Sequence, residues 1–85
     1  MDISDAIRLR IKNLAQENNL TVSRLCFLAG ISRSTLSKFL SGQRKMIRIE
    51  MIEFICEALH ITLKEFFNDK IFDQVLDVNL YENIG

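Results

Sequence analysis

The side chains best suited to chemistry gather between positions 33 and 38, where five of six residues are polar or basic. They are Arg33, Ser34, Thr35, Ser37 and Lys38. Guanidinium, ammonium and hydroxyl groups of this kind hydrogen-bond to phosphate oxygens and to the edges of nucleic-acid bases. The apolar residues Leu36, Phe39 and Leu40 recur in the same stretch at helical spacing. The pattern therefore predicts a short helix with one apolar face and one polar, basic face.

A second short helix is predicted just upstream, over about residues 21–29. Its apolar face comprises Val22, Leu25, Cys26 and Ala29. The Thr21 hydroxyl can cap its first turn, and Gly30 can take the left-handed conformation of a sharp turn at its end. Ser32 can cap the next helix, which Gly42 ends. Two short helices with this turn and this outer face are a candidate DNA-reading unit; an ordinary helical hairpin is the alternative, because spacing alone does not separate the two.

The order of residues over this region, and beyond it, matches a family pattern. The residues that carry it are Leu20, Thr21, Leu25, Cys26, the run 30–37, Ser41 and Gly42, then Ile52, Ile55, Ala58, Leu59, Ile61, Phe66 and Phe67. They resemble the lambda-repressor-like helix-turn-helix family, which includes phage repressors, Cro proteins and Xre-type regulators. The resemblance covers about residues 7–67. It implies an all-α domain of five helices that binds double-stranded DNA as a sequence-specific transcriptional regulator, a repressor acting as a homodimer.

The same resemblance assigns roles to individual side chains, because the second helix of the pair would lie in the major groove. The positions it places at base edges are Ser32, Arg33, Ser34 and Lys38. The positions it places at phosphates are Thr21, Arg24, Thr35, Gln43, Arg44, Lys45 and Arg48. Arg33 is the strongest candidate, since a guanidinium can donate two hydrogen bonds to one guanine edge. Ser32 also has the alternative role of a helix cap.

Three positions depart from the family's pattern. Gln commonly begins the first helix of the pair and contacts a phosphate, but Val22 stands there in this chain. Arg24 is an alternative anchor. Phe27 stands where the family usually has a polar residue, and we expect it to be partly buried in the core; an exposed aromatic at an interface is the alternative. Arg48 replaces the usual Ser or Thr cap, so the start of the following helix is weakly specified.

Charge is distributed unevenly along a chain with 11 basic and 11 acidic residues. Nine basic and three acidic residues precede Ile49, whereas two basic and eight acidic residues follow Arg48. The asymmetry predicts a basic face for phosphates and an acidic opposite end. The alternative is a solvated surface that is segregated by chance.

Apolar periodicity predicts three further helices, over about residues 2–18, 49–59 and 63–67. In the first, Arg8 and Lys12 lie off the apolar stripe and Arg10 lies at its edge. Such basic residues can contact phosphates, but Arg8 is expected to be solvated. In the second, Met51 or Phe54 could form a dimer seam. Thr62 and Glu65 form a capping box for the third, in which Leu63, Phe66 and Phe67 are expected to pack inward.

The predicted domain organisation is a helix-turn-helix domain over residues 1–69 and an extension over residues 70–85 that docks on the core or on a second subunit. The extension is too apolar for a free tail. Helical spacing fits Ile71 and Val75, while alternation around Asp77 fits a short strand, and both possibilities remain.

Composition excludes several classes of function. Cys26, Cys56 and His60 have no metal-site spacing, and we expect buried free thiols in a reducing cytoplasm. With no catalytic set, phosphate loop, signal peptide or apolar run of about 20 residues, we expect a cytoplasmic protein that is not an enzyme and needs no metal or cofactor. The rival function is a protein-interaction module of the same fold, an antitoxin or regulator partner with weak DNA binding, which Val22 and the acidic second half favour.

Overall fold

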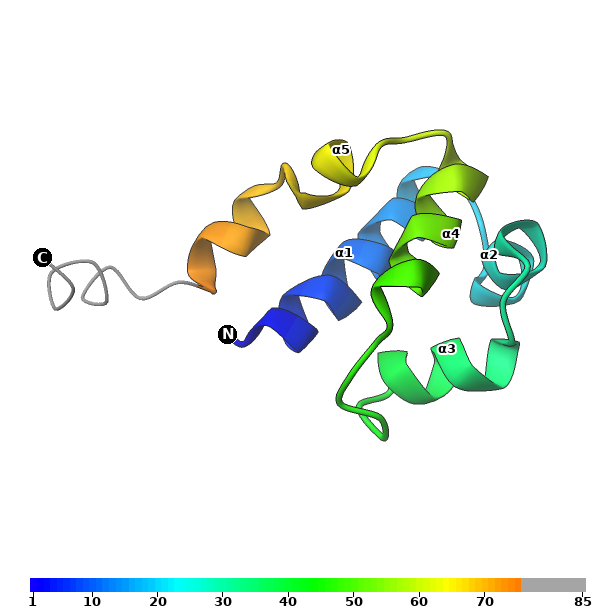
Figure 1. Cartoon of the computed structure of the whole chain (residues 1–85), viewed down its shortest axis with the longest axis horizontal. Helices are drawn as coiled ribbons and strands as arrows, with labels where there is room; N and C mark the ends of the chain where they lie inside the picture. Colours follow the sequence, from blue (N-terminus) through cyan, green and yellow to red (C-terminus); the bar gives the residue numbers. More distant parts are fainter. Residues whose placement is uncertain (76–85) are drawn as a thin grey trace, which may run out of the picture.

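The computed structural model describes residues 1–75, which form five α-helices and one short 3-10 helix (Figure 1). The elements are α1 (Ile3–Glu17), α2 (Val22–Ala29), α3 (Arg33–Leu40), α4 (Ile49–Leu59), α5 (Leu63–Phe67) and η1 (Lys70–Gln74). No strand occurs within these 75 residues, and the predicted all-α, five-helix fold is confirmed. The choice between helix and strand near Asp77 falls outside the described residues.

The helices pack so that α3 and α5 lie at opposite edges of the molecule. The second helix, α2, contacts both α3 and α4, whereas α1 contacts α2 and η1. Figure 1 shows α3 and the loop after it at the lower edge, with α5 at the upper edge. The polar face of α3 is therefore not covered by α5 or η1.

One apolar core is shared by α1 to α5. Its side chains with no exposed surface include Ile11, Leu25, Leu36, Ile55 and Phe66, one from each helix. These residues follow the helical periodicity of the sequence, so each helix turns one stripe inward. In the described part of the chain no helix has the length and hydropathy needed to cross a membrane.

Side-chain caps start four of the five α-helices. The caps are Asp2 for α1, Thr21 for α2, Ser32 for α3 and Thr62 for α5, each accepting a hydrogen bond from the amide three residues later. Glu65 completes the predicted capping box with Thr62. The exception is α4, because Arg48 makes no side-chain cap. That absence agrees with the weak start signal in the sequence.

The turn between α2 and α3 depends on Gly30. Its φ of 69° lies in the left-handed region, which glycine reaches without a steric cost. The next amide, of Ile31, donates to the Cys26 carbonyl at 3.0 Å. This hydrogen bond closes the end of α2 and sets the direction in which α3 leaves.

Both cysteines are buried free thiols, as predicted. Burial raises the pKa of the Cys26 thiol, and the positive charge of Arg33 partly offsets the shift. Burial likewise raises the pKa of the Cys56 thiol. Among the described residues no group of three or more His, Cys, Asp and Glu side chains could hold a metal ion.

Two apolar positions differ from expectation. Phe27 is 73% exposed rather than partly buried, because Leu25 and Cys26 already occupy the inner face of α2 and Phe27 falls on the outer one. Its ring lies 5.0 Å from the Arg24 guanidinium carbon. Leu63 is 39% exposed, since it begins the five-residue helix α5 and Phe66 takes the core position.

Arg10 is buried, although it lies at the edge of the apolar stripe of α1. Its Nε donates to the Phe66 carbonyl at 2.7 Å, and its Nη2 donates to the Glu65 carbonyl at 2.9 Å. Its Nη1 pairs with the Asp69 carboxylate at 3.1 Å. Arg10 therefore links α1 to α5 and, through Asp69, to the N-terminus of η1.

Candidate nucleic-acid interface

The outer face of α3 is polar and open to solvent. Ser34 and Lys38 are one helical turn apart, so they lie on the same face, and both are exposed. Arg33 is also exposed, on the flank of that face. Leu36, which lies on the opposite face, is fully buried. The helix therefore presents three of the four predicted base-contacting side chains outward.

The fourth predicted base-contacting residue, Ser32, is the N-cap of α3. Its Oγ accepts a hydrogen bond from the Thr35 amide at 3.4 Å, which is the alternative role that the sequence offered. Ser32 is itself exposed, at the end of α3 where Arg33 and Ser34 also lie. Thr35, a predicted phosphate contact, is half-buried on the other flank of the helix.

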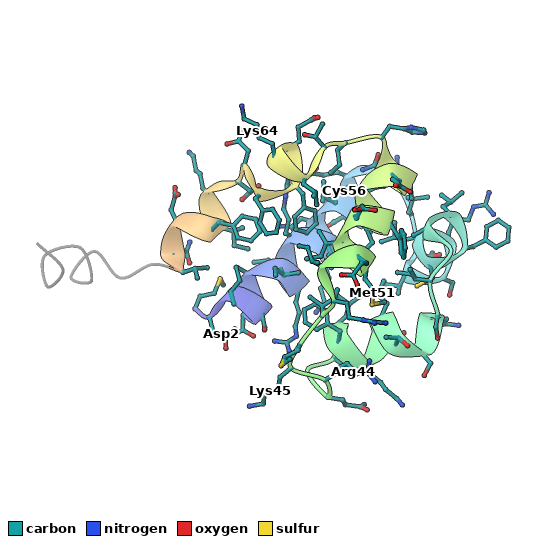
Figure 2. All side chains as sticks on the ribbon, viewed as in Figure 1. Asp2, Arg44, Lys45, Met51, Cys56 and Lys64 are labelled. Carbon is teal, nitrogen blue, oxygen red and sulfur yellow. The ribbon has the colours of Figure 1, made fainter. Side chains whose placement is uncertain are left out.

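The loop between α3 and α4, residues 41–48, carries three cations, of which Arg44 and Lys45 are adjacent in sequence. Its four predicted phosphate-contacting residues, all exposed, are Gln43, Arg44, Lys45 and Arg48. The Arg44 amide donates to the Lys38 carbonyl at 3.0 Å, so the loop folds back on the end of α3. Figure 2 shows Arg44 and Lys45 at the lower edge of the molecule, where α3 lies.

A groove runs beside α3 and includes a lysine that the sequence pattern did not assign to the interface. It has a volume of about 370 Å³, and its lining is Lys12, Val22, Arg33, Ser37, Leu40 and Ser41. Lys12 comes from α1 and is exposed. In the sequence, the position of Lys12 off the apolar stripe indicated an exposed side chain. No neighbouring residue indicated that this side chain would lie beside α3.

The two predicted phosphate-contacting residues of α2 are both exposed. The Thr21 Oγ1 accepts a hydrogen bond from the Arg24 amide at 3.1 Å, so it caps the helix. The Arg24 guanidinium stacks on Phe27 and is not part of the groove that Val22 and Arg33 line. The structure therefore places Lys12, rather than Arg24, beside Val22.

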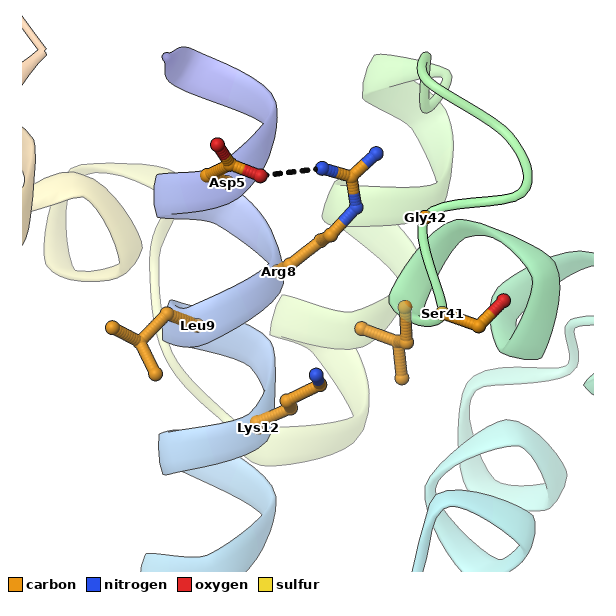
Figure 3. A pocket seen from close by; sticks show the side chains of 7 residues that line it. Asp5, Arg8, Leu9, Lys12, Ser41 and Gly42 are labelled. Atoms are coloured by element: carbon orange, nitrogen blue, oxygen red, sulfur yellow. Dashed lines mark hydrogen bonds and ion pairs between the residues drawn. The ribbon is translucent and has the colours of Figure 1, made fainter. Parts of the chain in front are cut away.

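Arg8 is not solvated, contrary to the sequence-based expectation. Its Nε donates to the Phe39 carbonyl at 2.6 Å, and its Nη2 donates to the Arg44 carbonyl at 3.0 Å. Its Nη1 pairs with the Asp5 carboxylate at 2.8 Å. Figure 3 shows this side chain leaving α1 toward the segment that carries Gly42, with Asp5 beside it. Helical periodicity could not reveal these bonds, because two of the three acceptors are backbone carbonyls far along the chain.

Comparisons with known proteins agree with this geometry. A family model described as a Cro/C1-type HTH DNA-binding domain matches residues 10–70. A solved structure described as the crystal structure of the prophage Lp1 protein 11 is similar, with a TM-score of 0.73 and 28% sequence identity. The match covers 81% of this chain and 92% of that one. No curated protein matches this chain.

Proposed function

Because this chain belongs to the Cro/C1-type helix-turn-helix DNA-binding family, we propose that it is a transcriptional repressor that binds a specific double-stranded DNA site as a homodimer. The observation that carries the proposal is the outward face of α3. Arg33, Ser34 and Lys38 are exposed there, and the loop cations Arg44 and Lys45 lie at the same edge of the molecule. The bound homodimer would block access of RNA polymerase to a promoter.

In this proposal α3 enters the major groove with its N-terminal residues toward the bases. Arg33 donates two hydrogen bonds to a guanine edge, a contact worth about 1–3 kcal/mol of discrimination. Ser34, in the same turn as Arg33, contacts a neighbouring base, and Lys38 contacts another from the next turn. Ser32 caps α3, and in this proposal its exposed hydroxyl contacts a base as well.

The loop between α3 and α4 binds the DNA backbone in this proposal. Gln43, Arg44, Lys45 and Arg48 contact phosphates, and Thr21, Arg24 and Thr35 contribute from α2 and α3. Contacts of this kind position the protein without reading sequence, and they make affinity depend on salt because bound counterions are released. The exposure of all four loop side chains supports this assignment.

We add Lys12 to the phosphate contacts, because it lines the groove beside Val22 and Arg33. A lysine there takes the place of the anchoring Gln that this chain lacks. We expect Lys12→Ala to reduce the slope of the logarithm of affinity against the logarithm of salt concentration by about 0.9. Titrations at four salt concentrations measure that slope. An unchanged slope would remove Lys12 from the interface.

The homodimer would place two copies of α3 in successive major-groove faces, about 34 Å apart. Phe54 on α4 is 39% exposed and Ile49 is 55% exposed, which makes this helix a candidate seam. Residues 70–85 form the proposed extension to the 1–69 domain. Ile71 is buried, and η1 contacts α1, which supports docking of the first part of the extension on the core.

The test of sequence reading is binding to DNA from upstream of the protein's own gene, with random DNA as competitor. We expect Arg33→Ala to weaken specific binding by about 5–150-fold, the equivalent of about 1–3 kcal/mol, and to leave random-DNA binding nearly as before. Lys64→Ala is the matched control, because Lys64 is an exposed cation on α5, at the opposite edge. Sedimentation of the saturated complex gives the number of chains bound.

A protein-interaction module is the second candidate, and the exposed ring of Phe27 favours it. An aromatic side chain that is 73% exposed is an efficient anchor in a protein interface. This candidate predicts weak binding that salt abolishes equally for every DNA sequence, with Arg33→Ala unchanged. The competition experiment therefore separates the two functions.

A further inference from the structure

We propose that Arg8 is a positioning residue for DNA binding. It fixes the backbone of the 41–48 loop against the end of α3. The side chains of Arg44 and Lys45 are thereby positioned to bind phosphate groups of DNA. The inference rests on the proposed function, because the loop matters only if it contacts DNA. It gives a binding role to a side chain of α1 that has 14% of its surface exposed.

The bonds of Arg8 span the junction between α3 and the loop. Phe39 belongs to the last turn of α3, where carbonyl groups lack intrahelical partners and favour a cation. Its carbonyl accepts from the Gly42 amide at 3.1 Å and from Arg8 Nε at 2.6 Å. The same guanidinium reaches the Arg44 carbonyl at 3.0 Å. One side chain therefore ties the end of the helix to the middle of the loop.

A second bond from α1 supports the same arrangement. Ser4 lies one helical turn before Arg8, and its Oγ donates to the Lys45 carbonyl at 2.7 Å. Two successive loop carbonyls, those of Arg44 and Lys45, are thus held by α1. The side chains of these two residues remain exposed. The backbone of the loop is fixed from the inside while its charges stay free for a ligand.

Asp5 separates a positioning role from direct phosphate binding by Arg8. Its carboxylate lies 2.8 Å from Arg8 Nη1 and neutralises the guanidinium where it meets the loop. The three guanidinium nitrogens of Arg8, Nε, Nη1 and Nη2, each donate a hydrogen bond within the chain. A charge that is paired and nearly covered contributes little to counterion release, so its effect on DNA must pass through Arg44 and Lys45.

Fixing the loop beforehand has a physical benefit. The segment contains Gly42 with a φ of 88° and has no regular secondary structure from residue 43 to residue 48. A free segment of this kind would lose backbone entropy when it bound DNA. Bonds from α1 remove that loss before the DNA arrives, which is the general advantage of preorganisation.

The experiment compares Arg8→Ala with Arg10→Ala. Both arginines come from α1 and each bonds two backbone carbonyls and a carboxylate, but Arg10 holds α5 and η1. We expect Arg8→Ala to lower affinity for operator and random DNA alike, and to reduce the salt slope by about 1 for each phosphate that the loop no longer binds. We expect faster hydrogen exchange at the Gly42 and Arg44 amides, which bond to α3. Arg10→Ala, measured where it is folded, should leave slope and exchange unchanged.

A further arm distinguishes positioning from direct binding of phosphate. In a background that carries Arg44→Ala and Lys45→Ala, Arg8→Ala should cause little additional loss of DNA affinity. A full additional loss would overturn the proposal, because it would mean that Arg8 binds phosphate itself. An unchanged salt slope in Arg8→Ala, with only a loss of stability, would overturn it as well.

Two outcomes keep the two proposals separate. If Arg8→Ala does not fold, Ser4→Ala removes one loop bond without disturbing a charge, and it should show the same changes on a smaller scale. A wild-type chain without salt-dependent DNA binding would overturn the proposed function, and no variant is needed to see this. Wild-type binding with a slope that neither Arg8→Ala nor Ser4→Ala alters would overturn the positioning role alone.

Discussion

Replacing Leu36 with alanine lowers the free energy of unfolding by about 2–5 kcal/mol, the range for a leucine removed from a close-packed core. Leu36 has no exposed surface and lies on the inner face of α3. Alanine leaves a cavity between α3 and the rest of the core, and the neighbouring helices can fill it only in part. Because a small domain has about 5–15 kcal/mol of stability in total, the variant is partly unfolded at moderate temperature.

Urea denaturation followed by circular dichroism measures this change. Ser37→Ala is the matched control, since Ser37 is adjacent in sequence and half-buried outside the core; we expect a change within about 0.5 kcal/mol. The midpoint of Leu36→Ala should fall while the slope with urea stays near that of the wild type. An unchanged midpoint would contradict the placement of Leu36 on the buried face of α3.

Replacing Arg10 with alanine lowers the free energy of unfolding by about 2–4 kcal/mol, because several hydrogen bonds to a charged group are removed together. The Arg10 side chain is 11% exposed, and its guanidinium donates to the carbonyls of Phe66 and Glu65. Without it these carbonyls lose a donor, and α5 is less firmly attached to α1. The aliphatic part of the side chain also leaves a gap against the core.

Two further variants separate the contribution of the carbonyl hydrogen bonds from that of the ion pair to this loss of stability. Arg10→Lys should recover only part of it, because one ammonium cannot reach all three acceptors in the geometry of a guanidinium. Asp69→Asn should cost less than about 1 kcal/mol, since the amide oxygen can still accept from the Ile71 amide, the Asp69 side chain is 36% exposed and exposed ion pairs contribute little. Equal losses in Asp69→Asn and Arg10→Ala, measured by thermal denaturation, would show that the ion pair rather than the carbonyl bonds carries the effect.

The parts of the fold that depend on local rules could be predicted from the sequence. The turn at Gly30, the caps at Thr21 and Thr62 and the weak start of α4 at Arg48 each follow from a few neighbouring residues, and the structure confirms them. The inward and outward faces of α3 follow from periodicity in the same way. The contacts assigned to individual side chains on DNA remain predictions.

The contacts that could not be predicted from the sequence are made with backbone groups far away along the chain. Arg8 and Arg10 each stand between two apolar residues and look alike in the sequence, yet their acceptors outside α1 lie 31 to 59 residues away. Lys12 enters the groove because α3 crosses beside it, a matter of helix packing rather than of pattern. The expectation for Phe27 is wrong because it equates apolar character with burial, and an aromatic residue can also be exposed.

The two arginines of α1 also bear on how the chain is made. Among the described residues, the acceptors of Arg10 all come from residues 65–69, and these are synthesised more than fifty residues after it. During translation, α2, α3 and α4 can form their mutual contacts first, because those lie close together in sequence. The contacts of the N-terminal helix with α5 and η1 can form only after residues 65–74 have left the ribosome. A messenger RNA truncated before the codon for residue 65 would therefore yield a chain that carries α3 on an incomplete core, open to proteolysis.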